Sequence, residues 1–213
     1  MKVVMGEQEK FRIYTQEREC VGTASREEVH KKGYWHETFH FWLIAEIDGE
    51  HFLYFQLRSE DKKDYPGLLD ITAAGHLLYN ESVEDGIREV KEEIGLTVAI
   101  EELDYLGVFP YEKEWRDFID KEHAHVFLLN RKILLHEFTL QPEEVSGVYL
   151  VPLDGFMDLW FENQSQTILI DGVIQSMEGK MEASKRKVNK TNFVPHREDF
   201  YKDVLQAIIS KIS

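Results

Sequence analysis

The stretch that decides the fold is AAGHLLYNESVEDGIREVKEEIGL, residues 73–96. Its second half predicts a helix from Ser82 to Ile94, because Ser82 is a favoured N-cap residue and Gly95 a favoured residue after a helix end. The apolar positions are separated by four, three and four residues: Val83, Ile87, Val90 and Ile94. This spacing places them on one face against a core and leaves the opposite face free for polar chemistry.

The polar face of this helix carries closely spaced carboxylates. Glu89, Glu92 and Glu93 stand at i, i+3 and i+4, so their side chains share a face, and Asp85 lies one turn earlier. Like charges at this spacing destabilise a bare helix, and a divalent cation relieves the repulsion. On the helix alone a solvated acidic face is the more common explanation, because charge runs usually face solvent. The residues around the helix change that balance.

The context of the helix matches a known motif. Gly75 is followed by Glu81 and then by the run Arg88-Glu89-Val90-Lys91-Glu92-Glu93-Ile94-Gly95-Leu96. This pattern resembles the Nudix box, and the run matches the second half of the box at every specified position. Six residues separate Glu81 from Arg88, where the family pattern has seven.

The resemblance implies a fold and a chemistry. The fold would be an α/β/α sandwich with a mixed β-sheet, in which the box forms a loop, a helix and a loop. Carried over to this chain, the ligands of a Mg²⁺ or Mn²⁺ cofactor are Glu89, Glu92, Glu93 and the carbonyl of Gly75. Arg88 would orient the carboxylates. Glu92 is the first candidate for the base that deprotonates the attacking water.

Histidines and acids near a predicted entry strand carry a second resemblance, to isopentenyl-diphosphate isomerases, a branch of the same fold. The segment SREEVHKKGYWHETFHFWLI (residues 25–44) is similar to the entry segment of those enzymes. TAAGH (residues 72–76) is similar to the segment that bears their catalytic cysteine and a metal-binding histidine. The resemblance implies a second metal or phosphate site formed by His30, His36, His76, Asp120 and Glu122.

One position separates this chain from the isomerases. Ala74 occupies the place of their catalytic cysteine, and a methyl group cannot deliver or remove a proton. The sequence therefore favours metal-dependent hydrolysis of a diphosphate linkage, in a nucleoside diphosphate derivative or a related small molecule, with Glu122 as a further catalytic candidate. Two alternatives stay open: the isomerase itself, and a Nudix domain that binds its ligand without catalysis. The retained box carboxylates argue against the second.

Composition restricts the partners. Forty acidic and 25 basic residues give a net charge of −15 over 213 residues, which repels nucleic acids and anionic membranes. A phosphorylated substrate is repelled too, unless a bound cation reverses the local charge. Cys20 is the only cysteine, so an intramolecular disulfide is excluded. Without a secretory signal or an apolar run near the ~20 residues of a membrane span, we expect a cytoplasmic protein.

The remaining pattern is mixed α and β. We expect a single domain, 1–213, with a core over about residues 25–165, a short N-terminal β extension and a C-terminal helical extension. The predicted helices are 26–32, 82–94, 153–161 and 198–212. The predicted strands are 36–47, 51–57, 70–74, 103–108, 125–129 and 148–151, the first two joined by the hairpin signal Asp48-Gly49. The C-terminal segment would either cover the site or form a homodimer contact.

Substrate selection is expected from loops around the box rather than from the box itself. Arg58 and Lys62 lie in a charged loop and would meet phosphates, although a solvated loop explains them equally well. Tyr65 and Trp115 are weaker candidates for stacking on a substrate, because aromatic residues more often belong to the core.

Overall fold

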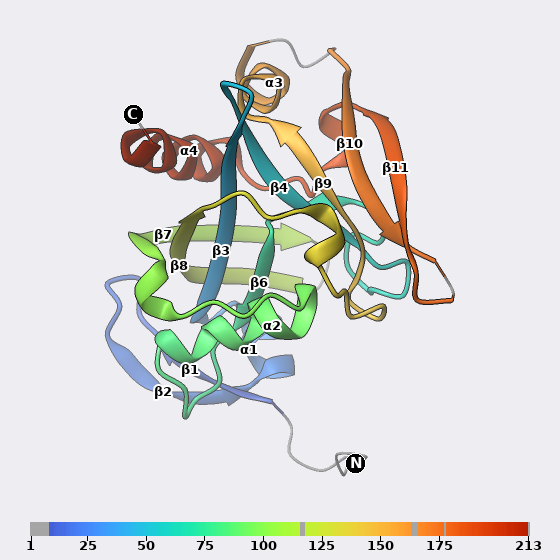
Figure 1. Cartoon of the computed structure of the whole chain (residues 1–213). Coiled ribbons are helices and arrows are strands. Elements are labelled where there is room, and N and C mark those ends of the chain that lie inside the picture. The colour runs from blue at the N-terminus through green and yellow to red at the C-terminus, as the bar shows by residue number, and fades with distance from the viewer. Residues whose placement is uncertain (1–8, 116–117, 163–165, 177, 213) are drawn as a thin grey trace.

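A computed structural model describes residues 9–212 except 116–117, 163–165 and 177. Its helices are α1 (Arg26–Lys32), α2 (Arg88–Ile94), α3 (Leu153–Met157) and α4 (Glu198–Ile212). Its strands are β1 (Lys10–Tyr14), β2 (Cys20–Ser25), β3 (Trp35–Ile47), β4 (Glu50–Arg58), β5 (Leu69–Asp70), β6 (Ala73–His76), β7 (Asp104–Trp115), β8 (Phe118–Asn130), β9 (Val145–Pro152), β10 (Ile168–Gln175) and β11 (Met181–Val188). Short 3₁₀ turns, among them η1 (Glu84–Ile87), join several of these elements. Figure 1 shows how the helices and strands are arranged.

The strands of the described residues form one mixed sheet. Its main path runs β11-β10-β9-β4-β3-β1-β2, and β5, β6, β7 and β8 pair beside it. β3 is the hub, because it pairs antiparallel with β4 and β6 and parallel with β8. The register sets His76 opposite Thr38 and Glu122 opposite His36. The pairing of β3 therefore brings the first residues of the box, the entry histidines and the later acids to one place.

Two hydrophobic cores lie on opposite faces of β3. Trp42 and Ile44 belong to the core that packs under α3 and α4, and the alternate residues Phe41 and Leu43 belong to the core under α2. Burying an aliphatic side chain such as Ile94 of α2 stabilises the fold by roughly 1.5–3 kcal/mol. The result is the expected sandwich, with a mixed sheet between helices (Figure 1).

The box helix differs from the continuous helix that the sequence predicts. The structure divides Ser82–Ile94 into the 3₁₀ turn η1 and the α-helix α2. Ser82 and Asp85 still form a reciprocal cap, since the Asp85 amide donates to the Ser82 hydroxyl (3.4 Å) and the Ser82 amide to the Asp85 carboxylate (2.8 Å). A 3₁₀ helix rises about 2.0 Å per residue against 1.5 Å in an α-helix. Four 3₁₀ residues therefore span about 8 Å, slightly more than the roughly 7.5 Å of five α-helical ones, and this offsets the residue missing between Glu81 and Arg88.

Several other predicted elements form as expected. α1 has the predicted bounds, with the Ser25 hydroxyl accepting from the Glu28 amide and Gly33 in the left-handed conformation at its end. The turn Asp48-Gly49 has positive φ at both residues, 54° and 85°, as a two-residue hairpin of this kind requires. α4 also has the predicted bounds.

Other predictions need correction. The strands expected at 103–108 and 125–129 are parts of the long hairpin β7–β8. The helix expected at 153–161 is α3 followed by a π-helical turn, Asp158–Glu162. The C-terminal part contains the hairpin β10–β11 as well as a helix. Its signal in the sequence is weak because β11 is an edge strand rich in charge, on which only Val188 is buried. No helix of the described residues is long and apolar enough to cross a bilayer.

Candidate metal centre and active site

Three imidazoles and one carboxylate converge where β3, β6 and β8 meet α1. Their ligating atoms all lie within 4.8 Å of one another, in a group formed by His30, His36, His76 and Asp120. α1 supplies His30, β3 supplies His36, the end of β6 supplies His76 and β8 supplies Asp120. We call this group the histidine cluster. It unites four of the five residues that the sequence assigned to a second site.

The converging atoms of the histidine cluster lack other partners. His30 Nε2, His36 Nε2, His76 Nε2 and Asp120 Oδ1 are buried without a hydrogen-bond partner among the described residues. Asp120 Oδ1 is 3.6 Å from the Nε2 atoms of His30 and His36, too far for a hydrogen bond. Each unsatisfied buried group costs about 1–3 kcal/mol. Four such atoms aimed at one point fit a bound divalent cation.

The second ring nitrogens hold two of these imidazoles in the right tautomer. His30 Nδ1 donates to the Arg26 carbonyl (2.8 Å) and His36 Nδ1 to the Tyr34 carbonyl (3.1 Å). A carbonyl can only accept, so each Nε2 keeps its lone pair, as in metal-binding histidines.

Burial sets the charge states in the histidine cluster. Loss of solvation lowers the pKa of His36 to about 3, and it lowers the pKa of His76 well below its usual value, helped by the nearby His36. Burial, with the charge of Glu122 beside it, raises the pKa of Asp120 well above its usual value. The imidazoles are therefore neutral near pH 7, which is the form that binds metals.

Glu122 lies beside the histidine cluster and is held by other residues. Its Oε2 accepts from the Thr38 hydroxyl (3.1 Å) and from His40 Nε2 (3.2 Å). Burial raises the pKa of Glu122 to about 7, and the hydrogen bond from Thr38 opposes that rise. His40 was outside the predicted set, although it follows His36 by four residues on the same strand face.

The box carboxylates are arranged differently from the histidine cluster. Glu93 is 8% exposed and accepts from Gln56 Nε2 (3.1 Å) and from the Ala74 amide (3.2 Å). Glu89 lies against Gly75, where any Cβ would overlap its carboxylate. The side chain of Glu92 is 55% exposed and, among the described residues, forms an ion pair with Arg88 Nη1 alone, at 3.2 Å. Two of the three carboxylates therefore face Ala74 and Gly75 of β6, and Glu92 faces solvent.

Arg88 ties the box together. Its Nε and Nη2 donate to the two carboxylate oxygens of Glu81 at 2.6 and 3.1 Å, its Nη1 to Glu89 at 2.5 Å, and Nη2 also to the His76 carbonyl at 3.2 Å. The pair with Glu81 forms despite the shortened spacing, because η1 offsets the missing residue. Burial, with the charge of Glu89, raises the pKa of Glu93 to about 8. Glu93 is thus poised to exchange a proton for a cation.

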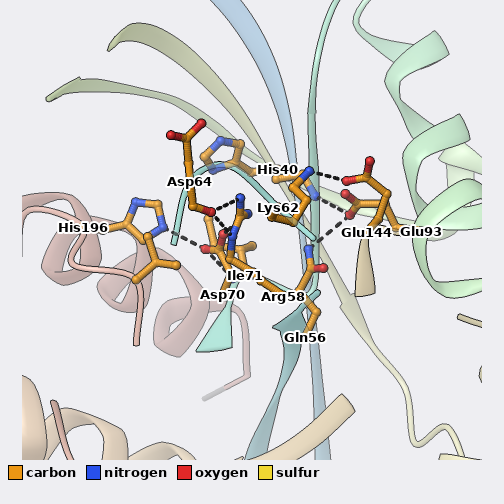
Figure 2. Close-up of polar contacts among 12 residues, drawn as sticks. His40, Gln56, Arg58, Lys62, Asp64, Asp70, Ile71, Glu93, Glu144 and His196 are labelled. Carbon is orange, nitrogen blue, oxygen red and sulfur yellow. Dashed lines mark hydrogen bonds and ion pairs between the residues drawn. The ribbon is translucent and has the colours of Figure 1, made fainter. Parts of the chain in front are cut away.

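A cavity of about 1140 Å³ borders the histidine cluster at His30. Its cationic lining residues are Arg26, Lys31, Arg58, Lys62 and Lys63, and five acids line it as well. Lys62 pairs with Glu144, on the loop before β9 (Figure 2). The cavity therefore contains Arg58 and Lys62, the two cations expected to meet phosphate. Tyr65 lies in a second cavity of about 680 Å³, and the side chain of Trp115 falls outside the described part of the chain.

A buried carboxylate holds Arg58 at the wall of this cavity. Asp70 Oδ2 accepts from Arg58 Nη1 (2.9 Å), and Asp70 Oδ1 accepts from His196 Nε2 (2.9 Å) (Figure 2). Burial alone would raise the pKa of Asp70, but the hydrogen bond from His196 and the charges of His196 and Arg58 hold it well below its usual value. The sequence offered no signal for this contact, because 126 residues separate Asp70 from His196.

Known proteins resemble the chain in sequence and fold. The sequence model of the NUDIX domain matches residues 36–171. An uncharacterised Nudix hydrolase of Clostridium acetobutylicum is 36% identical over 203 residues, which cover 95% of this chain and 98% of that protein. An isopentenyl-diphosphate Δ-isomerase of Aliivibrio fischeri is 34% identical over 139 residues, covering 64% of this chain and 76% of that protein. A Deinococcus radiodurans crystal structure has the same fold, with a TM-score of 0.51, 19% identity and coverage of 70% of this chain and 86% of that one.

Proposed function

The chain belongs to the Nudix hydrolase family, and on that premise we propose that it hydrolyses the diphosphate linkage of a nucleoside diphosphate derivative or a related small molecule with Mg²⁺ or Mn²⁺. The observation that carries the proposal is the convergence of four ligand atoms, without hydrogen-bond partners among the described residues, beside a cavity in which five cationic side chains balance five acids. In a protein with a net charge of −15, such a place suits an anionic substrate brought in with divalent cations.

Two sets of residues would hold metal. The histidine cluster would hold one divalent cation, and its imidazole-rich donor set suits a transition ion better than Mg²⁺. Glu89 and Glu93, with the carbonyl of Gly75, offer oxygen donors of the kind that Mg²⁺ prefers, and Glu92 would join them by turning in from solvent. When bound, such cations neutralise the diphosphate and lower the pKa of an attacking water.

The protein side chains would bind the substrate and move its protons. Arg58 and Lys62 would bind phosphate oxygens, and Lys62 would exchange its partner Glu144 for the substrate. Arg88 would keep Glu89 in place through the ion pairs that join both to Glu81. For the base, Glu92 has an unburied carboxylate that water reaches, and the pKa of Glu122, about 7, is matched to proton transfer near neutrality.

Isomerisation of isopentenyl diphosphate is the second candidate. The similarity to the Aliivibrio enzyme and the histidine cluster favour it. Against it stands Ala74, whose side chain has no group that can transfer a proton to or from carbon. The amide of Ala74 is engaged by Glu93 (3.2 Å) and offers no substitute. A binding domain without catalysis is a third candidate, disfavoured by the retained carboxylates.

A hydrolysis screen tests the proposal. The purified protein is offered nucleoside di- and triphosphates, dinucleotide cofactors, nucleotide sugars and isopentenyl diphosphate with Mg²⁺ or Mn²⁺. We expect cleavage of one class, lost on chelation and in Glu92→Gln, and retained in Glu101→Gln, an exposed control on a neighbouring turn. Isomerised isopentenyl diphosphate without cleavage would favour the second candidate, and binding without any turnover the third. Activity that survives thorough chelation would exclude the metal mechanism.

A further inference from the structure

The segment Asn189–Arg197 lies beyond residues 36–171, which carry the family pattern, and it lines the second cavity, yet its His196 contacts the carboxylate that holds Arg58. Phe193 forms a parallel bridge with Leu69 of β5, and the Val194 amide donates to the Leu69 carbonyl (2.8 Å). Phe193 and Val194 are buried. Lys113 Nζ on β7 donates to the Pro195 carbonyl (3.0 Å). The three residues before His196 are therefore held by β5 and β7, next to the residue Asp70 that follows Leu69.

His196 connects this segment to the phosphate-binding cavity. One Asp70 oxygen accepts from His196 Nε2 and the other from Arg58 Nη1, each at 2.9 Å (Figure 2). Arg58 Nε and Nη2 donate to the Asp64 carbonyl at 3.1 and 2.8 Å. Three of the five N–H groups of Arg58 thus fix its guanidinium, and two remain for a ligand. The orientation of those two depends on the Asp70 carboxylate, which His196 holds from the opposite side.

The surroundings of His196 argue against a role in packing alone. Its ring lies among the rings of Tyr111, Phe200 and Tyr201, at centroid distances of 5.2, 5.7 and 5.2 Å. Its Nδ1 is buried with no hydrogen-bond partner in the described residues. A phenylalanine would fill the same aromatic site without an unsatisfied nitrogen. What the imidazole adds over a phenyl ring is therefore the hydrogen bond that its Nε2–H donates to Asp70.

We propose that His196 is a positioning residue of the phosphate-binding site: it fixes Asp70, which orients Arg58 toward the diphosphate, so that the segment after the family pattern completes the site. This inference rests on the proposed function, in which Arg58 binds phosphate. It assigns His196 no contact with the reacting atoms.

Calorimetric titration with inorganic pyrophosphate and Mg²⁺ tests the proposal without requiring turnover. We expect His196→Phe to weaken binding by about tenfold, as for the loss of one hydrogen bond to a charged group. His196→Gln keeps an amide N–H for Asp70 and should recover most of the affinity. Asp70→Asn should resemble His196→Phe, because its amide N–H₂ would face Arg58. The matched control is His136→Phe, the same substitution at an exposed turn, with no expected effect.

A double-mutant cycle separates positioning from a general loss of structure. If His196 acts through Arg58, adding His196→Phe to Arg58→Ala should weaken pyrophosphate binding no further. Additive losses, or wild-type affinity in His196→Phe, would overturn the inference and leave the proposed function standing. No binding of pyrophosphate by the wild-type protein would overturn both. Melting temperatures of each variant identify one that has merely unfolded, and Asp70→Asn, which conserves volume, then carries the test in place of His196→Phe.

Discussion

The box helix and the histidine cluster are both acid- or imidazole-rich candidate metal sites, and they are built in opposite ways. The box carboxylates Glu89, Glu92 and Glu93 come from two turns of one helix. The histidine cluster draws its four ligands from α1, β3, β6 and β8, over a span of 90 residues from His30 to Asp120. Yet the box carboxylates, although close together in the sequence, do not converge in the described structure. Glu92 turns to solvent, while Glu89 and Glu93 turn inward.

This difference shows what spacing along a helix can and cannot do. Positions i, i+3 and i+4 place side chains on one face, but the rotamers and the neighbours decide where the carboxylates point. In the histidine cluster, hydrogen bonds to backbone carbonyls fix His30 and His36, so the ligand atoms are oriented before any cation binds. We therefore expect the box to complete its ligand set around metal and substrate, and the histidine cluster to bind a cation tightly without substrate.

The largest expected effect is a loss of turnover in a variant of the box, and it tests whether the box belongs to the active site. Glu93→Gln should lower kcat by at least about a hundredfold, because the buried carboxylate is a candidate ligand of the cation that stabilises the transition state. Gln keeps the side-chain volume, so folding should be little affected. Steady-state kinetics with the substrate found in the screen measures the effect, with Glu101→Gln as control. Full activity in Glu93→Gln would remove the box from the active site.

An intermediate effect is expected at the histidine cluster. His36→Asn should weaken retention of one divalent cation by at least about 10–100-fold, because that is the loss when only an outer-shell partner of a ligand is removed. Elemental analysis of protein dialysed in Mn²⁺ should show one ion fewer than in the wild type. His51→Asn, on the hairpin end of β4, serves as the matched control. Equal metal content in all three proteins would show that the histidine cluster is a packed group of neutral histidines and no metal site, so it could not be compared with the box as one.

The smallest effect concerns Asp70, a second group assembled from distant segments. The partners His196 and Arg58 hold the folded-state pKa of Asp70 below its usual value of 3.8, against the opposing effect of burial. A lowered folded-state pKa gives stability that is present above pH 3.8 and is lost as the pH falls below it. Acid should therefore lower the unfolding free energy of the wild type by on the order of 2 kcal/mol. Asp70→Asn lacks this contribution at every pH, so acid should not remove it from the variant.

Denaturant titrations from pH 7 down to about pH 2 measure this effect, because most of the loss falls below the usual pKa of 3.8. The difference in unfolding free energy between the wild type and Asp70→Asn should shrink as the pH falls. A constant difference would mean that the carboxylate of Asp70 does not depend on Arg58 and His196 in the folded state.

The sequence predicted well what depends on neighbours along the chain. The caps at Ser25 and Ser82, the turn at Asp48-Gly49 and the glycine ends of α1 and α2 all follow from local backbone chemistry. The sequence predicted the secondary structure less well where consecutive residues form only a weak pattern. The 3₁₀ turn before Arg88 accompanies the residue missing between Glu81 and Arg88. β11 lacks a clear strand pattern because most of its side chains are polar and face solvent.

The residues at the site also fall into two groups, those that a sequence motif identifies and those that only the structure identifies. Gly75, Glu81 and Arg88 are readable in sequence because the motif gives their residue types and nearly their spacing, and the structure joins them through the Arg88 guanidinium and the Glu89 carboxylate. The catalytic and metal-binding roles assigned to them stay predictions until the variants are measured. Asp70 and His196 carry no motif at all.

By itself the sequence determined the family, the amphipathic helix of the box and the residue types of the site, because periodicity, caps and motif spacing are properties of consecutive residues. Only the tertiary structure decided which ligand atoms converge, which carboxylate is buried and that residue 196 reaches Asp70. Those outcomes depend on the register of β3 with β6 and β8 and on the bridge between Leu69 and Phe193. Such pairings join residues far apart in the chain, and no local pattern specifies them.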